Sequence, residues 1–214
     1  MENNLKNITD IIDLYTKYGE SDYIGESITQ TEHAIQCAEL AIHDSRLDRY
    51  DEYIRNCVIV AALLHDIGHL IGIQDNDMQM CNCNTDNKFG NASLGIVGHE
   101  GIGSIYLKQC GMPSLVCELV DSHVAAKRYL CTVRTDYYEK LSDASKETMR
   151  MQGGMMNNEQ IKDFKSSFMP ELKIFIREYD DEAKKIGLDL SKSKTISFYN
   201  NYLQKALIHG GLFV

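Results

Sequence analysis

The sequence predicts an all-α protein that folds as one helical bundle over residues 1–214. Apolar residues recur at three- and four-residue spacings along most of the chain, which is the period of a helix face. Proline occurs only at positions 113 and 170, so long helices are permitted. Strand-like alternation is scarce, and we find no internal repeat. With 214 residues, of which 43% are hydrophobic, the chain is long enough to bury a substantial core.

The first part of the chain is expected to hold three helices. Residues 4–18 place their apolar side chains on one helix face. Thr29 or Thr31 can cap a second helix, which continues to about residue 45. A third helix covers about 51–67, and we expect Gly68 to end it.

Residues 72–96 differ from the rest of the chain. They are rich in Asn, Asp, Gly and Cys and have no clear period, so we expect an irregular loop insertion. Helix is expected again from His99 to Gln109, and Gly111 follows as a stop. Further helices are expected at 113–127, about 136–150, about 158–187 as one or two, and 195–209.

Charge and cysteine content restrict the class of protein. Lys and Arg number 22 against 31 Asp and Glu, so the net charge of -9 argues against general nucleic-acid binding. The first residues lack the pattern of a secretory signal, and the longest apolar run, 58–64, is too short to span a bilayer. Seven cysteines in a chain of this size suggest reduced thiols. We therefore expect a cytoplasmic protein that does not engage membranes.

Histidines and aspartates in helical segments suggest a metal site. They are His33, His65, Asp66, His99, His123 and Asp180. Each has an ordinary structural explanation alone, but together they can close around one or two ions. His65 and Asp66 end an apolar helix and point about 100° apart, so they can approach a metal from different sides, and the carboxylate can bridge to a second ion. Imidazole and carboxylate without thiolate favour iron, manganese, magnesium or zinc.

The sequences that flank these residues are more specific. They read DYIGESITQTEHAIQCA, AALLHDIGH, HEGIGSIYL, HVAAKRYL, KLSDASKETM and REYDDE. Together they resemble the HD-domain mixed-valent diiron oxygenases, over about residues 12–205. The resemblance implies an HD-type helical bundle around a dinuclear metal site. It also implies an iron-dependent dioxygenase that uses O2 to cleave (R)-2-amino-1-hydroxyethylphosphonate, at its C–P bond, into glycine and phosphate.

The resemblance also implies how the ligands are divided. One iron ion of the mixed-valent Fe(II)/Fe(III) pair is held by His33, His65, Asp66 and Asp180. The other is held by His99 and His123, and Asp66 bridges the two. Asp181 is a rival to Asp180 for the last position.

Substrate residues follow from the same resemblance and from helix spacing. A phosphonate needs cationic and hydroxyl donors, and those implied are His69, Lys127, Ser145, Thr148 and Arg177. Lys127 lies four residues after His123, and Arg177 three before Asp180, so each shares a helix face with a ligand. Tyr23 is expected to close the site until substrate displaces it, and Glu26 to bind the substrate ammonium. Tyr23, Glu26, His69 and Lys127 are the expected catalytic residues.

Two alternatives remain open at this point. One is an oxygenase for the N-trimethylated hydroxyphosphonate, giving glycine betaine. Glu26 favours a primary ammonium, because a quaternary amine prefers aromatic faces; the chain has no Trp but twelve Tyr. The other is a divalent-metal HD phosphohydrolase acting on a phosphate ester or nucleotide, which fits DYIGE and the four histidines less well. In each case the partner is a small molecule, an organophosphonate in the favoured reading, and the protein a monomer or weak homo-oligomer.

Overall fold

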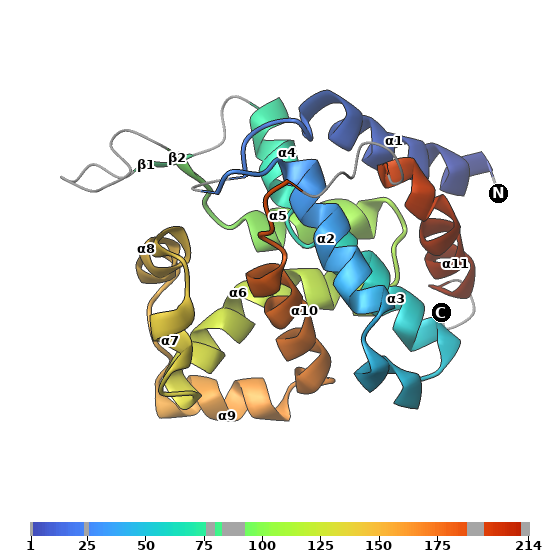
Figure 1. Ribbon diagram of the computed structural model, residues 1–214. Helices are drawn as coiled ribbons and strands as arrows, with labels where there is room; N and C mark the ends of the chain where they lie inside the picture. Colours follow the sequence, from blue (N-terminus) through green and yellow to red (C-terminus); the bar gives the residue numbers. More distant parts are fainter. Residues whose placement is uncertain (1, 24–25, 76–79, 83–92, 188–194, 211–214) are drawn as a thin grey trace.

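A computed structural model describes residues 2–23, 26–75, 80–82, 93–187 and 195–210. These residues are mostly helical, so the expected all-α class is confirmed (Figure 1). The helices are α1 (Glu2–Tyr18), α2 (Gln30–Ile42), α3 (Glu52–Leu64), α4 (Ile67–Gln74), α5 (His99–Gln109), α6 (Ser114–Val133), α7 (Tyr137–Lys140), α8 (Asp143–Met151), α9 (Asn158–Ser166), α10 (Pro170–Glu182) and α11 (Asn200–Gly210). Short 3-10 turns, η1 (Ser45–Arg49) and η2 (Ile196–Tyr199), precede α3 and α11.

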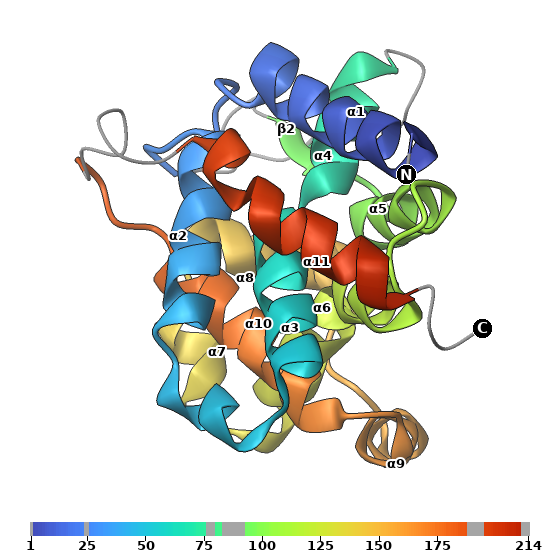
Figure 2. The ribbon, with the colours of Figure 1, turned by 90° about the vertical axis from the view of Figure 1, so that its right-hand side faces the viewer.

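Helix α3 forms the centre of the bundle. Every side chain from Cys57 to Leu64 is buried, so this helix is apolar all round, as a central helix must be. Helices α2, α6, α10 and α11 pack against it, and α1 and α11 lie side by side over one end (Figure 2). Buried free thiols are found at Cys37, Cys57, Cys110, Cys117 and Cys131.

The break between α3 and α4 differs from the expected one. Helix α3 ends at Leu64, and α4 begins at Ile67 and contains Gly68, so the expectation that Gly68 ends the helix was wrong. A Cβ at position 68 would lie 2.0 Å from the His99 carbonyl oxygen. Gly68 is therefore needed for the close approach of α4 to α5 rather than for a helix stop. The break leaves His65 and Asp66 at the bend.

The segment expected as an irregular loop, 72–96, also differs. Helix α4 continues to Gln74, and strands β1 (Met80–Asn82) and β2 (Ser93–Ile96) pair antiparallel, with Met80 opposite Ile96. Strands of three and four residues are too short to show an alternating pattern in sequence. The remainder of that expected loop, 76–79 and 83–92, lies outside the described residues.

One result bears on membrane insertion. In the part of the chain that the structure describes, no single helix is both long and apolar enough to cross a bilayer. The pair α3 and α4 reaches that length and apolarity together, with a bend of 41° between them.

Candidate metal centre and substrate pocket

The six predicted metal ligands meet inside the bundle. Helices α2, α5, α6 and α10 and the α3–α4 break contribute them, and none is more than 7% exposed. The residues are His33, His65, Asp66, His99, His123 and Asp180. Residues that lie up to 147 positions apart are thus brought together by the packing of these helices around α3.

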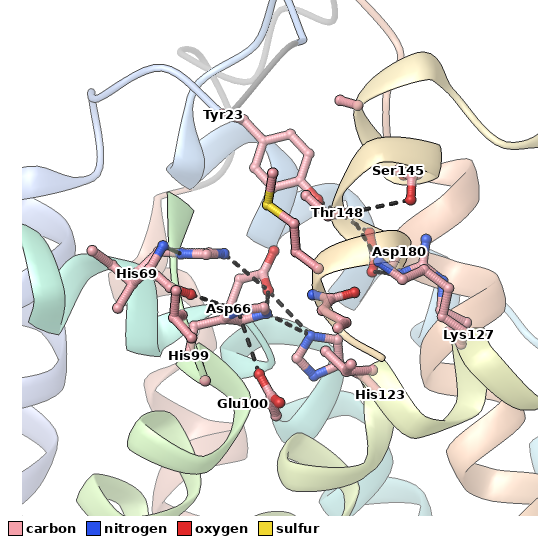
Figure 3. A pocket seen from close by; sticks show the side chains of 18 of the residues that line it. Tyr23, Asp66, His69, His99, Glu100, His123, Lys127, Ser145, Thr148 and Asp180 are labelled. Atoms are coloured by element: carbon pink, nitrogen blue, oxygen red, sulfur yellow. Dashed lines mark hydrogen bonds and ion pairs between the residues drawn. The ribbon is translucent and has the colours of Figure 1, made fainter. Parts of the chain in front are cut away.

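Asp66 lies between two pairs of histidines. Its Oδ2 is 3.2 Å from His65 Nε2 and 3.7 Å from His33 Nε2. Its Oδ1 is 3.3 Å from His99 Nε2 and 3.4 Å from His123 Nε2 (Figure 3). One carboxylate oxygen therefore faces each pair, which is the arrangement of a carboxylate that bridges two cations.

Asp180, and not Asp181, lies beside the first pair. Asp180 Oδ1 is 3.5 Å from His33 Nε2, and Oδ2 is 3.9 Å from His65 Nε2. Asp181 instead forms an ion pair with Arg177 and accepts a hydrogen bond from the Tyr137 hydroxyl. The first histidine pair thus has two carboxylates next to it, and the second pair has only Asp66.

Backbone carbonyls fix which nitrogen of each histidine carries the proton. The Nδ1 atoms of His33, His65, His99 and His123 lie 2.9, 2.9, 3.2 and 2.7 Å from the carbonyl oxygens of Ala183, Ala62, Ile96 and Val120. A carbonyl only accepts, so each Nδ1 donates and each Nε2 presents a lone pair. This is how metal-bound histidines are usually oriented.

The lone pairs face one another at short range, which provides a test of metal fit. His33 Nε2 lies 3.2 Å from His65 Nε2, and His99 Nε2 lies 3.0 Å from His123 Nε2. Lone pairs at such distances repel unless a cation lies between them. Nitrogen ligands at about 2.0–2.1 Å from one metal are themselves separated by about 3 Å. The four imidazoles and two carboxylates therefore fit two borderline cations such as iron.

The negative charge of Asp66 and Asp180 also suits a bound cation. Burial alone would lower the pKa of His65, but the carboxylates of Asp66 and Asp180 raise it to about 9. A proton on His65 thus takes the place of a cation when no metal is bound, and metal binding must release it.

His69 lies near this cluster but has the opposite tautomer. Its Nδ1 accepts a hydrogen bond from the Ile96 backbone N–H at 3.1 Å, so its Nε2 carries the proton. By distance alone, His69 could join Asp66 and His99 around a metal. The protonated Nε2, 4.0 Å from Asp66 Oδ1, argues for a hydrogen-bond donor rather than a ligand. Burial, with His99 next to it, keeps the pKa of His69 well below its usual range.

Tyr23 covers the first histidine pair. Its ring stacks on His33, with ring centroids 3.8 Å apart, and its hydroxyl donates to Asp180 Oδ1 at 3.2 Å. Burial and the neighbouring Asp180 raise the pKa of Tyr23 well above its usual range, so it stays a neutral phenol. Tyr23 is held by the bridge between Asp22 and Thr29, the residue that caps α2.

A cavity of about 370 Å³ opens onto this cluster of histidines and aspartates (Figure 3). All the predicted substrate-binding and catalytic residues line it: Tyr23, Glu26, His69, Lys127, Ser145, Thr148 and Arg177. Lys127 is 3% exposed and donates to Thr148 Oγ1 at 3.0 Å. Burial and the positive charge of Arg177 lower the pKa of Lys127 to about 7.

Arg177 is already engaged by protein groups. It donates to Asp180 Oδ2 at 2.6 Å, to Asp181, and through Nε to the Tyr137 hydroxyl at 3.2 Å. Three of its five N–H groups are used in this way, and its role in phosphonate binding stays a prediction. The contact of Arg177 with Asp180 also fixes the orientation of Asp180 toward the histidines.

Sequence reasoning missed Lys184. It lies just beyond α10, lines the cavity and donates to Ser145 Oγ at 3.1 Å. The same four-residue spacing that indicated Lys127 relative to His123 separates Lys184 from Asp180, and it could have indicated Lys184 as well. Glu100, Met151 and Gln152 are further lining residues without an expected role.

Comparison with known proteins agrees with this geometry. The model of the HD domain matches residues 31–157, more than half of the chain. The chain belongs to the HD-domain family. This HD-domain protein is 38% identical over 204 residues to an uncharacterised protein of Acanthamoeba polyphaga mimivirus, covering 95% of this chain and 83% of that one.

Two further relatives of this HD-domain protein have described activities. One is the [1-hydroxy-2-(trimethylamino)ethyl]phosphonate dioxygenase (glycine-betaine-forming) of Leisingera caerulea, 32% identical over 192 residues, which are 87% of this chain and 85% of that protein. The other is the hydroxymethylphosphonate dioxygenase of Gimesia maris, 33% identical over 203 residues, which are 94% of this chain and 89% of that protein. The chain therefore belongs to the branch of the HD-domain family that contains these phosphonate dioxygenases.

Proposed function

We propose that this protein is an iron-dependent dioxygenase that cleaves the C–P bond of (R)-2-amino-1-hydroxyethylphosphonate with O2, giving glycine and phosphate. The observation that carries the proposal is the position of Asp66, with one oxygen toward each histidine pair, at the base of a cavity lined by cationic and hydroxyl donors. The dioxygenase relatives, 32% and 33% identical, support the same reaction class.

The ligand sets of the two metal positions are unequal. His33, His65, Asp66 and Asp180 would hold one iron, and His99, His123 and Asp66 the other. The second position has fewer protein donors, which leaves room for small molecules, as catalytic metal sites require. Iron in a mixed-valent pair would supply the redox chemistry with O2 that these side chains cannot supply themselves.

The remaining side chains bind and orient the substrate. Lys127, Ser145 and Thr148 form a cationic and hydroxyl-bearing wall for the phosphonate, and the protonated Nε2 of His69 adds a neutral donor. Tyr23 closes the opposite side and keeps water from the reacting atoms until substrate enters.

The lining of the cavity favours a primary over a quaternary amine. Apart from histidines, Tyr23 is the one aromatic residue among the described lining residues, and its ring stacks on His33. A trimethylammonium group prefers several aromatic faces. Glu26 instead offers a carboxylate, which suits an ammonium that donates hydrogen bonds. Hydroxymethylphosphonate is the second candidate, because Lys184 lies 3.4 Å from Glu26 and can neutralise it without a substrate amine.

The test is O2 uptake by the iron-loaded protein given each of the three hydroxyphosphonates in turn, with phosphate and the organic product measured together. We expect equal amounts of O2 consumed, glycine and phosphate with the primary amine. O2 uptake only with the trimethylated or hydroxymethyl compound would assign that compound as the substrate and keep the same class of reaction. Phosphate release from phosphate esters without O2 consumption would instead identify a phosphohydrolase.

A further inference from the structure

Lys184 is a cation of the cavity that the proposed reaction has not used. Its Nζ lies 3.1 Å from Ser145 Oγ, 3.5 Å from Ser142 Oγ and 3.4 Å from Glu26 Oε1. Glu26 comes from the segment before α2, and Ser142 and Ser145 come from the start of α8. Lys184 therefore joins two walls of the cavity.

Lys184 and Lys127 form a matched pair. Lys127 donates to the Thr148 hydroxyl at 3.0 Å, as Lys184 donates to that of Ser145. Ser145 and Thr148 are three residues apart on α8 and share a helix face. A hydroxyl that accepts from a lysine has its own proton left to donate. The Thr148 hydroxyl donates its proton to the Ser145 backbone carbonyl oxygen at 3.2 Å, whereas the Ser145 hydroxyl can turn its donor toward an anion.

The charges around a doubly negative phosphonate also favour a role for Lys184. Arg177 directs three of its five N–H groups to Asp180, Asp181 and Tyr137. Lys127 and Lys184 also line the cavity, and they donate to the hydroxyl groups of Thr148 and Ser145 rather than to Asp180 or Asp181.

Glu26 gives Lys184 a second role. Among the described residues, nothing donates a hydrogen bond to Glu26 Oε1, although this oxygen is buried. Buried acceptors rarely lack a hydrogen bond. The Nζ of Lys184, 3.4 Å from Glu26 Oε1, compensates the negative charge of the carboxylate but does not supply that hydrogen bond. The oxygen can still accept a hydrogen bond from an incoming ammonium.

We propose that Lys184 determines which phosphonates are accepted: it neutralises Glu26 when the substrate carries no amine, and a substrate ammonium takes over that role when one is present. This inference rests on the proposed function. It implies that the loss of Lys184 leaves Glu26 uncompensated against a phosphonate without an amine. A substrate with a primary ammonium brings its own compensating charge.

The test is calorimetric binding to the iron-loaded protein without O2, using methylphosphonate and 2-aminoethylphosphonate, which both lack the hydroxyl group to be oxidised. Lys184→Met should raise the ratio of the methylphosphonate Kd to the 2-aminoethylphosphonate Kd about tenfold, the size of one charge-assisted hydrogen bond. Lys184→Arg should keep the ratio of the unmodified protein. Glu26→Gln combined with Lys184→Met should bring the methylphosphonate Kd back to that of the unmodified protein, because no uncompensated carboxylate remains.

Lys185→Met is the matched control. Lys185 is the next residue, it is exposed, and its backbone rather than its side chain bonds Gln36; this variant should leave both Kd values unchanged. An unchanged ratio in Lys184→Met, with both ligands bound by the unmodified protein, would overturn the role of Lys184 alone. Failure of the unmodified protein to bind either phosphonate would overturn the proposed function together with this inference.

Discussion

At the scale of single residues, Asp66 is the group on which both halves of the proposed metal centre depend. Removing it should empty both positions, because each histidine pair faces one of its oxygens. We expect Asp66→Ala to retain almost no iron after gel filtration, and His123→Ala to retain about half, since His123 faces only the second position. Metal analysis of the purified variants measures this.

Asp180 and Asp181 provide the control for that experiment. Asp180→Asn should lose iron from the first position, whereas Asp181→Asn should keep both ions, because Asp181 bonds Arg177 and Tyr137. Normal iron content in Asp66→Ala, or greater loss in Asp181→Asn than in Asp180→Asn, would contradict the ligand assignment.

Lys127 gives the site a dependence on pH. Its pKa of about 7 results from burial and from Arg177, so the lysine is cationic below that pH and neutral above it. A phosphonate binds the cationic form, and kcat/KM reports groups of the free enzyme. We therefore expect kcat/KM to fall as pH rises through about 7.

Lys127→Met is the variant that checks this assignment. It should keep its iron, lose that limb of the pH profile and lower kcat/KM by about tenfold or more, the value of a hydrogen bond to a charged group. A variant profile that still falls above the same pH would assign that limb to another group.

The sequence predicts which site residues lie together where both are on one helix. It does not do so where they are on two segments that meet only in the folded protein. The spacing of Lys127 after His123 suffices to put both on one face of α6. The hydrogen bond from Arg177 to Tyr137 depends on how α7 meets α10, whereas the ion pair of Arg177 with Asp181 follows from their four-residue spacing on α10. The position of Lys184 next to Glu26 likewise depends on two segments far apart in the sequence.

At the scale of elements, the approach of α4 to α5 sets the distance between the histidine pairs. Gly68→Ala would put a Cβ 2.0 Å from the His99 carbonyl oxygen, so α4 and α5 must separate. We expect a loss of about 1–3 kcal/mol in the free energy of unfolding and weaker iron binding at His99. Denaturant unfolding and metal analysis measure the two effects.

Gly101→Ala is the matched control on α5. A Cβ there would meet Asp121 Oδ1 at 3.7 Å, an ordinary contact, so alanine should leave iron binding unchanged and stabilise the helix by up to about 1 kcal/mol. Equal behaviour of the two variants would mean that the close approach at Gly68 does not matter.

The helices could be predicted from the spacing of apolar residues, but the positions at which helices break could not always be. The bounds expected for the His99–Gln109 helix agree with α5. Gly68 has the appearance of a helix stop in sequence, because the contact with His99 that requires a glycine comes from another helix. The helix expected over 113–127 continues as α6 to Val133, since no breaking residue intervenes.

At the scale of the whole molecule, the proposed metal centre lies where α2, α5, α6 and α10 meet around α3. Six buried groups with lone pairs or negative charge lie together there. A cation that binds only the folded chain stabilises it by mass action, by about 3–4 kcal/mol at metal concentrations of a hundred to a thousand times Kd. We expect chelation to lower the Tm of the unmodified protein.

Asp66→Ala is the control for this effect, because it should unfold at the same temperature with and without iron. Equal Tm values for chelated and iron-loaded unmodified protein would show that metal does not hold the helices together at this point.

An HD-domain fold does not by itself decide between oxidation and hydrolysis, because function depends on the site. Atom balance separates the two. Cleavage of the aminohydroxyphosphonate by O2 adds one oxygen atom to the carbon that becomes the glycine carboxylate and one to the phosphorus that becomes phosphate. Hydrolysis would take that oxygen from water.

The most direct measurement is therefore turnover of (R)-2-amino-1-hydroxyethylphosphonate by the iron-loaded protein under isotopically labelled O2, with mass analysis of both products. The diiron dioxygenase that we propose predicts one labelled oxygen atom in glycine and one in phosphate. Phosphate whose added oxygen atom comes from water, formed without consumption of O2, would contradict it.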